Sequence, residues 1–174
     1  MKILIIYATK TNTVSDCIEL LKKYLPNAEF ALCNIKDKDI PKLSDFDFII
    51  IGSPVRMNKF DKKILSFMKS QKKVLLQNKV AYFVCCAFPD CFGNYVNKNI
   101  PQDLRQNAIE IGCFGGRLDI ERQRGIDKLI TKMVRADILG GGNNGEARRD
   151  ESLPTVLENN ISQFAEIIRG QIKK

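Results

Sequence analysis

Apolar runs and amphipathic stretches alternate along the 174-residue chain. Apolar runs of strand length occupy residues 2–7, 28–33, 46–51, 79–86 and 108–114. Apolar residues recur at helical spacing after residue 13, from about residue 59, and over residues 154–172. Continuous apolar strands that are separated by helices are typical of a parallel sheet covered on both faces. The pattern therefore predicts an open α/β fold, in which ligands bind at the carboxyl ends of the strands.

The chain has the length of one domain that can bury a substantial core, so we expect a single domain over residues 1–174. One further stretch, residues 125–139, carries an apolar stripe at helical spacing and is rich in lysine and arginine. A glycine-rich segment at residues 140–145 follows it. We interpret residues 117–150 as a basic helical insertion after the fifth strand.

Histidine is absent from the chain, which narrows the possible chemistry. Without it, serine–histidine and cysteine–histidine triads and any imidazole base are excluded. If the protein is an enzyme, a cofactor is expected to carry the reaction. The net charge of +8 favours anionic partners, although a lysine-rich surface also serves solubility alone. No nucleic-acid-binding motif is present, so no nucleic-acid partner is expected.

Six cysteines lie on or beside apolar segments, which favours reduced and mostly buried thiols. The spacing of Cys85, Cys86 and Cys91 does not match a zinc site, and we expect no bound metal. The apolar runs are too short to cross a bilayer, and the first residues show no signal-peptide pattern. We therefore expect a cytoplasmic protein.

A hydroxyl-rich turn, Ala8 to Thr13, joins the first strand directly to an amphipathic helix. The free N–H groups at the start of that helix, its dipole and the threonine hydroxyls together favour phosphate binding. An ordinary turn in which Thr11 or Thr13 caps the helix explains the same residues. Neither the Rossmann nor the Walker glycine pattern occurs, so a bound phosphate would belong to a mononucleotide.

Four stretches of the chain together resemble the flavodoxin-domain family that includes menaquinone-dependent protoporphyrinogen oxidase. They are residues 7–14, residues 51–56 together with 59–60, the end of the fourth apolar run at 86–88, and residues 114–118. The resemblance implies a flavodoxin-like open parallel sheet of five strands in the order 2-1-3-4-5, with helices on both faces. It also implies a noncovalent FMN and an oxidoreductase or electron-carrier function that requires no catalytic side chain.

The resemblance also implies which residues hold the FMN. The phosphate is expected on Thr9, Lys10, Thr11, Asn12 and Thr13. The isoalloxazine ring is expected between Ser53, Pro54, Val55, Arg56, Asn58 and Lys59 on one side and Cys86, Ala87, Phe88, Phe92 and Tyr95 on the other. Ser53 and Asn58 can hydrogen-bond a flavin edge, and the aromatic side chains can stack on the ring. Arg56 and Lys59 can favour a reduced, anionic flavin. Each aromatic residue can equally cover the edge of the core, and both cations can simply be solvated.

The chain departs from the family's phosphate loop, Ser/Thr-x-Ser/Thr-Gly-x-Thr, at two positions. Asn12 replaces the glycine, and we expect the turn to be kept because asparagine tolerates a left-handed backbone. Val14 replaces the last threonine, and the lost hydroxyl costs about 1.5–3 kcal/mol, or roughly ten- to a hundred-fold in affinity. The alternative is therefore a binding or regulatory module that has kept the scaffold but binds FMN weakly or not at all.

Candidate partners follow from the resemblance and from the basic segment. We expect a redox partner protein, or a quinone or porphyrinogen substrate. Basic side chains in the insertion can meet porphyrinogen propionates or the surface of an anionic membrane; they are Arg117, Arg122, Arg124, Lys128, Lys132 and Arg135. Alternatively, the helix packs its apolar stripe onto the domain.

Overall fold

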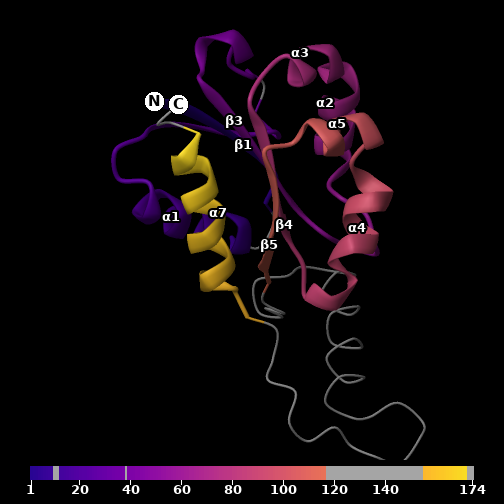
Figure 1. The fold of residues 1–174 in the computed structure, drawn as a ribbon. Coiled ribbons are helices and arrows are strands. Elements are labelled where there is room, and N and C mark those ends of the chain that lie inside the picture. The colour runs from indigo at the N-terminus through magenta and orange to yellow at the C-terminus, as the bar shows by residue number, and fades with distance from the viewer. Residues whose placement is uncertain (10–11, 38, 117–154, 172–174) are drawn as a thin grey trace, which may run out of the picture.

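The computed structural model describes residues 1–9, 12–37, 39–116 and 155–171. Within them, five parallel strands form one sheet in the order β2-β1-β3-β4-β5 (Figure 1). The strands are β1 (Lys2–Tyr7), β2 (Glu29–Asn34), β3 (Phe48–Pro54), β4 (Val80–Cys85) and β5 (Glu110–Gly115). The predicted fold class and strand order are confirmed.

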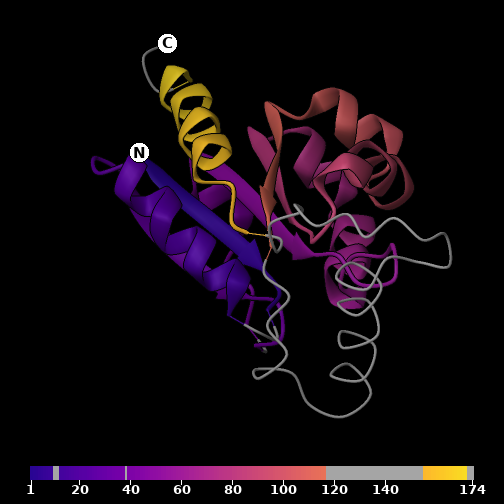
Figure 2. The same ribbon diagram turned by 90° about the horizontal axis from the view of Figure 1, so that it is seen from below.

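Helices cover both faces of the sheet (Figures 1 and 2). One face carries α1 (Thr13–Tyr24) and α7 (Glu158–Gly170). The other carries α2 (Lys62–Ser70), α3 (Lys72–Leu76), α4 (Phe92–Asn99) and α5 (Gln102–Asn107). Two short 3-10 turns, Leu43–Asp45 and Pro89–Cys91, complete the described elements.

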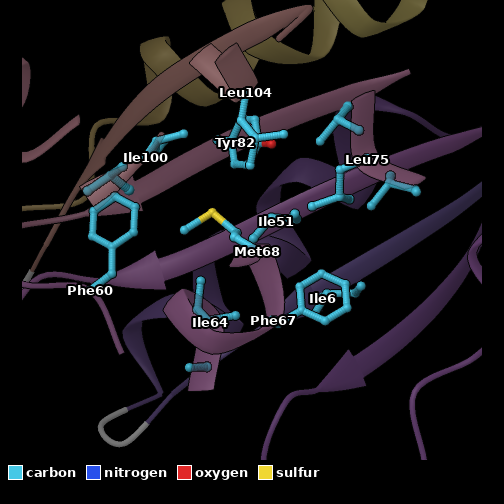
Figure 3. Packing of buried hydrophobic residues seen from close by; sticks show 14 of the residues in the cluster. Ile6, Ile51, Phe60, Ile64, Phe67, Met68, Leu75, Tyr82, Ile100 and Leu104 are labelled. Carbon is cyan, nitrogen blue, oxygen red and sulfur yellow. The ribbon is translucent and has the colours of Figure 1, made fainter. Parts of the chain in front are cut away.

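The two helical layers explain why the strands are apolar along their whole length. Side chains of a strand alternate between its faces. In β1, Ile3 and Ile5 belong to the cluster under α1 and α7, whereas Leu4 and Ile6 belong to the cluster under α2 to α5. Figure 3 shows the second cluster, in which Met68 of α2 lies close to the sheet. Apolar side chains of β1 are therefore buried on both faces of the sheet.

Two predicted boundaries near the candidate site are wrong. The third strand was expected to stop before Gly52, but β3 continues to Pro54 because Ser53 and Pro54 pair with Val84 and Cys85 of β4. The helix expected from about residue 59 begins only at Lys62. The side chain of Asp61 accepts a hydrogen bond from the Lys63 amide at 2.9 Å, which makes Asp61 the N-cap.

No helix among the described residues is long and apolar enough to span a bilayer. The predicted basic insertion at residues 117–150 and its six named lysines and arginines lie outside the described residues, as does the helix expected over residues 125–139. The single-domain organisation stays a prediction.

Candidate functional site

The loops that follow β1, β3, β4 and β5 meet at the carboxyl edge of the sheet. Backbone hydrogen bonds continue the strand pairing into these loops. The Ala8 amide donates to the Gly52 carbonyl oxygen at 3.2 Å, and the Val55 amide donates to the Cys85 carbonyl oxygen at 2.9 Å. The Cys86 amide donates to the Gly115 carbonyl oxygen at 2.9 Å. The edge is therefore where the predicted phosphate turn and the two predicted ring loops come together.

The turn before α1 keeps the conformation that a glycine would adopt. Asn12 has φ 62° and ψ −12°, in the left-handed region, and its carbonyl oxygen accepts the first helical hydrogen bond, from the Asp16 amide at 2.8 Å. The expectation that asparagine preserves the turn is confirmed. The Asn12 side chain makes no capping hydrogen bond, and Thr13 is the first helical residue rather than a cap. The first amides of α1 consequently lack partners inside the helix.

Thr9 is the clearest sign of a ligand at this turn. Its Oγ1 atom is buried and has no hydrogen-bond partner among the described residues. Leaving a buried hydroxyl unpaired costs about 1–3 kcal/mol, so this atom calls for an explanation, for which a bound phosphate is one candidate. Lys10 and Thr11, the next two predicted phosphate residues, lie outside the described residues.

Two lysine ammonium groups lie beside the turn. Lys36 Nζ donates a hydrogen bond to the carbonyl oxygen of Thr9, and Lys63 Nζ donates to the carbonyl oxygen of Lys36 at 3.3 Å. The pairing of β2 with β1 places Lys36 here, because the Ile35 amide donates to the Tyr7 carbonyl oxygen at 2.7 Å. Neither lysine was predicted as a site residue, since no local motif in the sequence marks them.

Val14 does not face the turn. Its side chain is 1% exposed and packs in the cluster under α1 and α7, with Cys17 and Ile18 of the same helix. A side chain at this position is surrounded by apolar groups, which gives a packing reason for valine. The missing hydroxyl at residue 14 therefore reflects a position that belongs to the core in this chain.

The loop after β3 is a tight turn. Arg56 and Lys59 exchange backbone hydrogen bonds of 2.9 and 3.0 Å, and both residues between them are left-handed, Met57 with φ 48° and Asn58 with φ 62°. Met57 is 81% exposed, which is unusual for a methionine. Lys59 and Asn58 are exposed, whereas Val55 and Arg56 are half-buried.

Ser53 uses its hydroxyl inside this loop. Its Oγ accepts a hydrogen bond from the Asp61 amide at 3.0 Å and donates to the Pro54 carbonyl oxygen at 3.1 Å. Ser53 as a whole is 1% exposed, so its hydroxyl does not face open solvent. The hydroxyl instead ties the start of the loop to the N-cap of α2.

The turn is held by a buried asparagine that was not among the predicted site residues. Asn99, the last residue of α4, is buried, and its Oδ1 accepts a hydrogen bond from the Phe60 amide at 2.9 Å. Its Nδ2 donates to the carbonyl oxygens of Asn58 at 3.1 Å and Tyr95 at 2.8 Å. No sequence pattern marks Asn99 as part of the site, because its loop partners Asn58 and Phe60 are 41 and 39 residues away along the chain.

The predicted ring contacts in the loop after β4 differ in how exposed they are. Phe88 is 41% exposed, and Ala87 and Phe92 are half-buried. Tyr95 instead packs in the core, where burial raises its pKa to about 12, and Cys86 is also buried. Phe88 is thus the aromatic side chain of this loop that is free to cover a ligand.

A model of the flavodoxin domain matches residues 4–143 of the chain. The protein belongs to the flavodoxin domain family. This flavodoxin-family protein is similar in structure to Fusobacterium nucleatum flavodoxin bound to flavin mononucleotide, with 14% identity, a TM-score of 0.52 and 98% of each chain covered. A mutant of that flavodoxin, also bound to flavin mononucleotide, gives 14% identity and a TM-score of 0.51 over 98% of this chain and 96% of the other.

Oxidised flavodoxin 1 from Bacillus cereus is 18% identical, with a TM-score of 0.43 over 62% of this chain and 92% of the other. The two similarities to the Fusobacterium nucleatum flavodoxin, with TM-scores above 0.5, support the fold alone. No curated protein matches the chain.

Proposed function

We propose that this flavodoxin-family protein binds FMN noncovalently at the carboxyl edge of the sheet and acts in electron transfer. The observation that carries the proposal is the unpartnered, buried Thr9 hydroxyl beside the left-handed turn at Asn12. A phosphate at this place would accept a hydrogen bond from Thr9 Oγ1 and from the free amides of the first turn of α1. The solved relative from Fusobacterium nucleatum contains flavin mononucleotide.

Charge supports the same ligand. Lys36 places its ammonium group against the Thr9 backbone, and an ammonium has three donors, of which this hydrogen bond uses one. Lys63 adds a second positive charge nearby. A dianionic phosphate would thus be attracted by two cations as well as by the positive end of the helix dipole.

The ring would lie between the turn at residues 55–59 and the loop at residues 86–92. Met57 and Phe88 are exposed apolar side chains on these two loops and are available to cover the ring faces. Arg56 and Lys59 bring positive charge to the first loop. Bound FMN supplies reversible one- and two-electron chemistry, and the protein supplies binding, orientation and charge.

The test is the visible spectrum of the purified protein, followed by titration of flavin-free protein with FMN. Thr9→Val removes the unpaired hydroxyl with little change in shape. It is expected to weaken FMN binding about ten-fold or more, because a lost hydrogen bond to a charged group costs about 1.5–3 kcal/mol. The flavin-free variant should be at least as stable as the parent, since it no longer buries an unpaired polar atom.

Ser66→Ala, which removes an exposed hydroxyl from α2, is the control and should leave the affinity unchanged. If Thr9→Val bound FMN as tightly as the parent, the Thr9 hydroxyl would not contact the phosphate, and the proposal would lose this support. An absence of binding at saturating FMN would overturn the electron-transfer proposal. It would favour the alternative of a regulatory module, which the departures from the family's phosphate loop at Asn12 and Val14 support.

We further propose, as a narrower activity, protoporphyrinogen oxidation with a quinone acceptor. It is supported by the sequence resemblance and by the basic side chains between residues 117 and 135, which suit propionates. Porphyrin fluorescence should rise when flavin-loaded protein, protoporphyrinogen and a menaquinone analogue are mixed under nitrogen. Free FMN is the control. A rate equal to that of free FMN would contradict this activity, and a redox partner protein would then be the expected electron acceptor.

Contact with an anionic membrane is proposed on the same six basic residues. Co-sedimentation with vesicles of phosphatidylglycerol should exceed that with phosphatidylcholine and should fall as salt is added. Equal binding to both vesicle types would contradict it.

A further inference from the structure

Two cysteine thiols lie side by side beneath the loop that follows β4. The Sγ atoms of Cys86, the first residue after β4, and Cys113 of β5 are 3.7 Å apart. Both side chains belong to the cluster that also contains Tyr95. In the register of the strands, Cys113 lies opposite Val84, and the irregularity that follows brings Gly115 beside Cys85. All six cysteines of the protein are free thiols in this structure.

The two thiols differ in acidity. The hydrogen bond from Cys86 lowers the pKa of Cys113 to about 7, although burial opposes this effect, and a backbone hydrogen bond at Gly115 lowers the pKa further. The same hydrogen bond between the thiols, together with burial, raises the pKa of Cys86. Because the thiolate is the reactive form, the lower pKa favours Cys113 as the nucleophile and Cys86 as its partner thiol.

We propose that Cys86 and Cys113 form a redox-active dithiol that a small hydroperoxide converts into a disulfide. The side chains are 2% and 8% exposed, so the oxidant must be of the size of hydrogen peroxide. The site lies at the carboxyl edge of the sheet, but its chemistry requires no flavin.

The reaction balances in two steps. The Cys113 thiolate attacks one oxygen of hydrogen peroxide, the O–O bond breaks, and hydroxide leaves as Cys113 becomes a sulfenic acid. The Cys86 sulfur then attacks the Cys113 sulfur, and the sulfenic oxygen leaves as hydroxide. One hydroxide takes up the Cys86 proton, and the other takes up, from the buffer, the proton that Cys113 released when it ionised. The two thiols are thereby oxidised by two electrons, and the peroxide is reduced to two molecules of water.

Closing the bond requires the sulfur atoms to approach from 3.7 Å to about 2.05 Å. The movement would fall near two strand ends, because Cys86 begins the loop after β4 and Cys113 lies two residues before Gly115, the last residue of β5. The product would tie this loop covalently to β5.

The chain offers an internal comparison. Cys17 of α1 and Cys85 of β4 also have Sγ atoms 3.7 Å apart, but they lie in the cluster on the opposite face of the sheet. They are 0% and 5% exposed, and the hydrogen bond with Cys17 and burial raise the pKa of Cys85 well above its ordinary value. We therefore expect no disulfide from this pair at the same separation.

The test treats the reduced full-length protein with a small excess of hydrogen peroxide, removes the peroxide, and counts thiols after denaturation. The six thiols should fall to four, and peptide mass spectrometry should find Cys86 linked to Cys113. Cys113→Ser should keep its remaining thiols, and Cys86→Ser should accumulate a sulfenic acid at Cys113 that dimedone traps. The double variant Cys17→Ser, Cys85→Ser should still form the bond. Circular dichroism checks that each variant is folded.

Three results would overturn the proposal: no loss of thiols, a link between Cys17 and Cys85, or oxidation that occurs at Cys91 alone. A Cys113→Ser variant that loses thiols as fast as the parent would overturn it as well. None of these readings depends on FMN, so a failure here is distinct from a failure of flavin binding.

Discussion

The buried Asn99 side chain holds the exposed turn of the candidate flavin site, since its Nδ2 donates to the Asn58 carbonyl oxygen at 3.1 Å. Asn58 and Met57 are both left-handed, and such residues persist only where the surroundings impose the conformation. The amide of Asn99 supplies this constraint from α4, with one further hydrogen bond to the loop at Phe60 and one to its own helix at Tyr95.

Asn99→Ala is therefore expected to destabilise the protein by about 2–4 kcal/mol, because three hydrogen bonds are lost and the buried Phe60 amide stays unpaired. Urea unfolding monitored by circular dichroism measures the change. Asn94→Ala, an exposed position on α4, is the matched control and should change stability by less than about 0.5 kcal/mol. Equal losses in the two variants would show that the hydrogen bonds contribute nothing.

Replacing Asn12 by alanine should destabilise the protein more than replacing it by glycine. Asn12→Ala keeps a Cβ but lacks the local polar group that helps asparagine adopt a left-handed backbone, so we expect a loss of about 1 kcal/mol. Asn12→Gly should lose less stability than Asn12→Ala, because glycine adopts this conformation freely. FMN titration should show weaker binding for the alanine variant than for the glycine variant. The reverse order would mean that the turn does not position the phosphate.

Val14→Thr restores the family's threonine, yet it is expected to destabilise the protein. The new hydroxyl would enter an apolar cluster without a partner, at a cost of about 1–3 kcal/mol. Val74→Thr, at a half-buried position on α3, should cost less. FMN affinity should not increase, since the side chain does not face the turn. An increase in affinity would show that residue 14 can reach the ligand.

Gly52 is required by packing rather than by backbone freedom. A Cβ at this position would lie 2.1 Å from the Phe83 ring, which stacks on Phe114 with ring centroids 4.6 Å apart. Gly52→Ala is expected to cost about 3 kcal/mol or more, because a buried ring must move. Gly93→Ala, where a Cβ meets nothing within 4 Å, should instead stabilise α4 by up to about 1 kcal/mol. Thermal unfolding of both variants tests the contrast.

The ion pair of Lys72 and Asp103 predicts a loss of stability at low pH. The hydrogen bond from Lys72 lowers the pKa of Asp103 in the folded protein below its ordinary value. The stabilisation is therefore complete above the ordinary pKa and is lost as the pH falls through the folded-state pKa. Lys72→Met should raise the pKa of Asp103, measured by NMR titration of its side chain. Lys73→Met, also exposed, is the control and should leave it unchanged.

Several features of the fold and the turn could be predicted from local patterns. Uninterrupted apolar runs such as residues 79–86 indicated a sheet covered on both faces, and the structure has that sheet. The tolerance of asparagine for a left-handed backbone correctly predicted the turn at Asn12. The end of β3 could not be predicted, because glycine, serine and proline read locally as a stop, whereas pairing with β4 extends the strand to Pro54.

The sequence by itself determined the strand order through a family resemblance and the layers through hydrophobic periodicity, which is a local property of each segment. Only the tertiary structure decided that Lys36 reaches Thr9, that Asn99 holds Asn58, and that Cys86 meets Cys113. Each of these contacts joins residues that are 27 or 41 positions apart. They depend on strand register and on the direction of each side chain, which are set only when the whole sheet and its helices pack together.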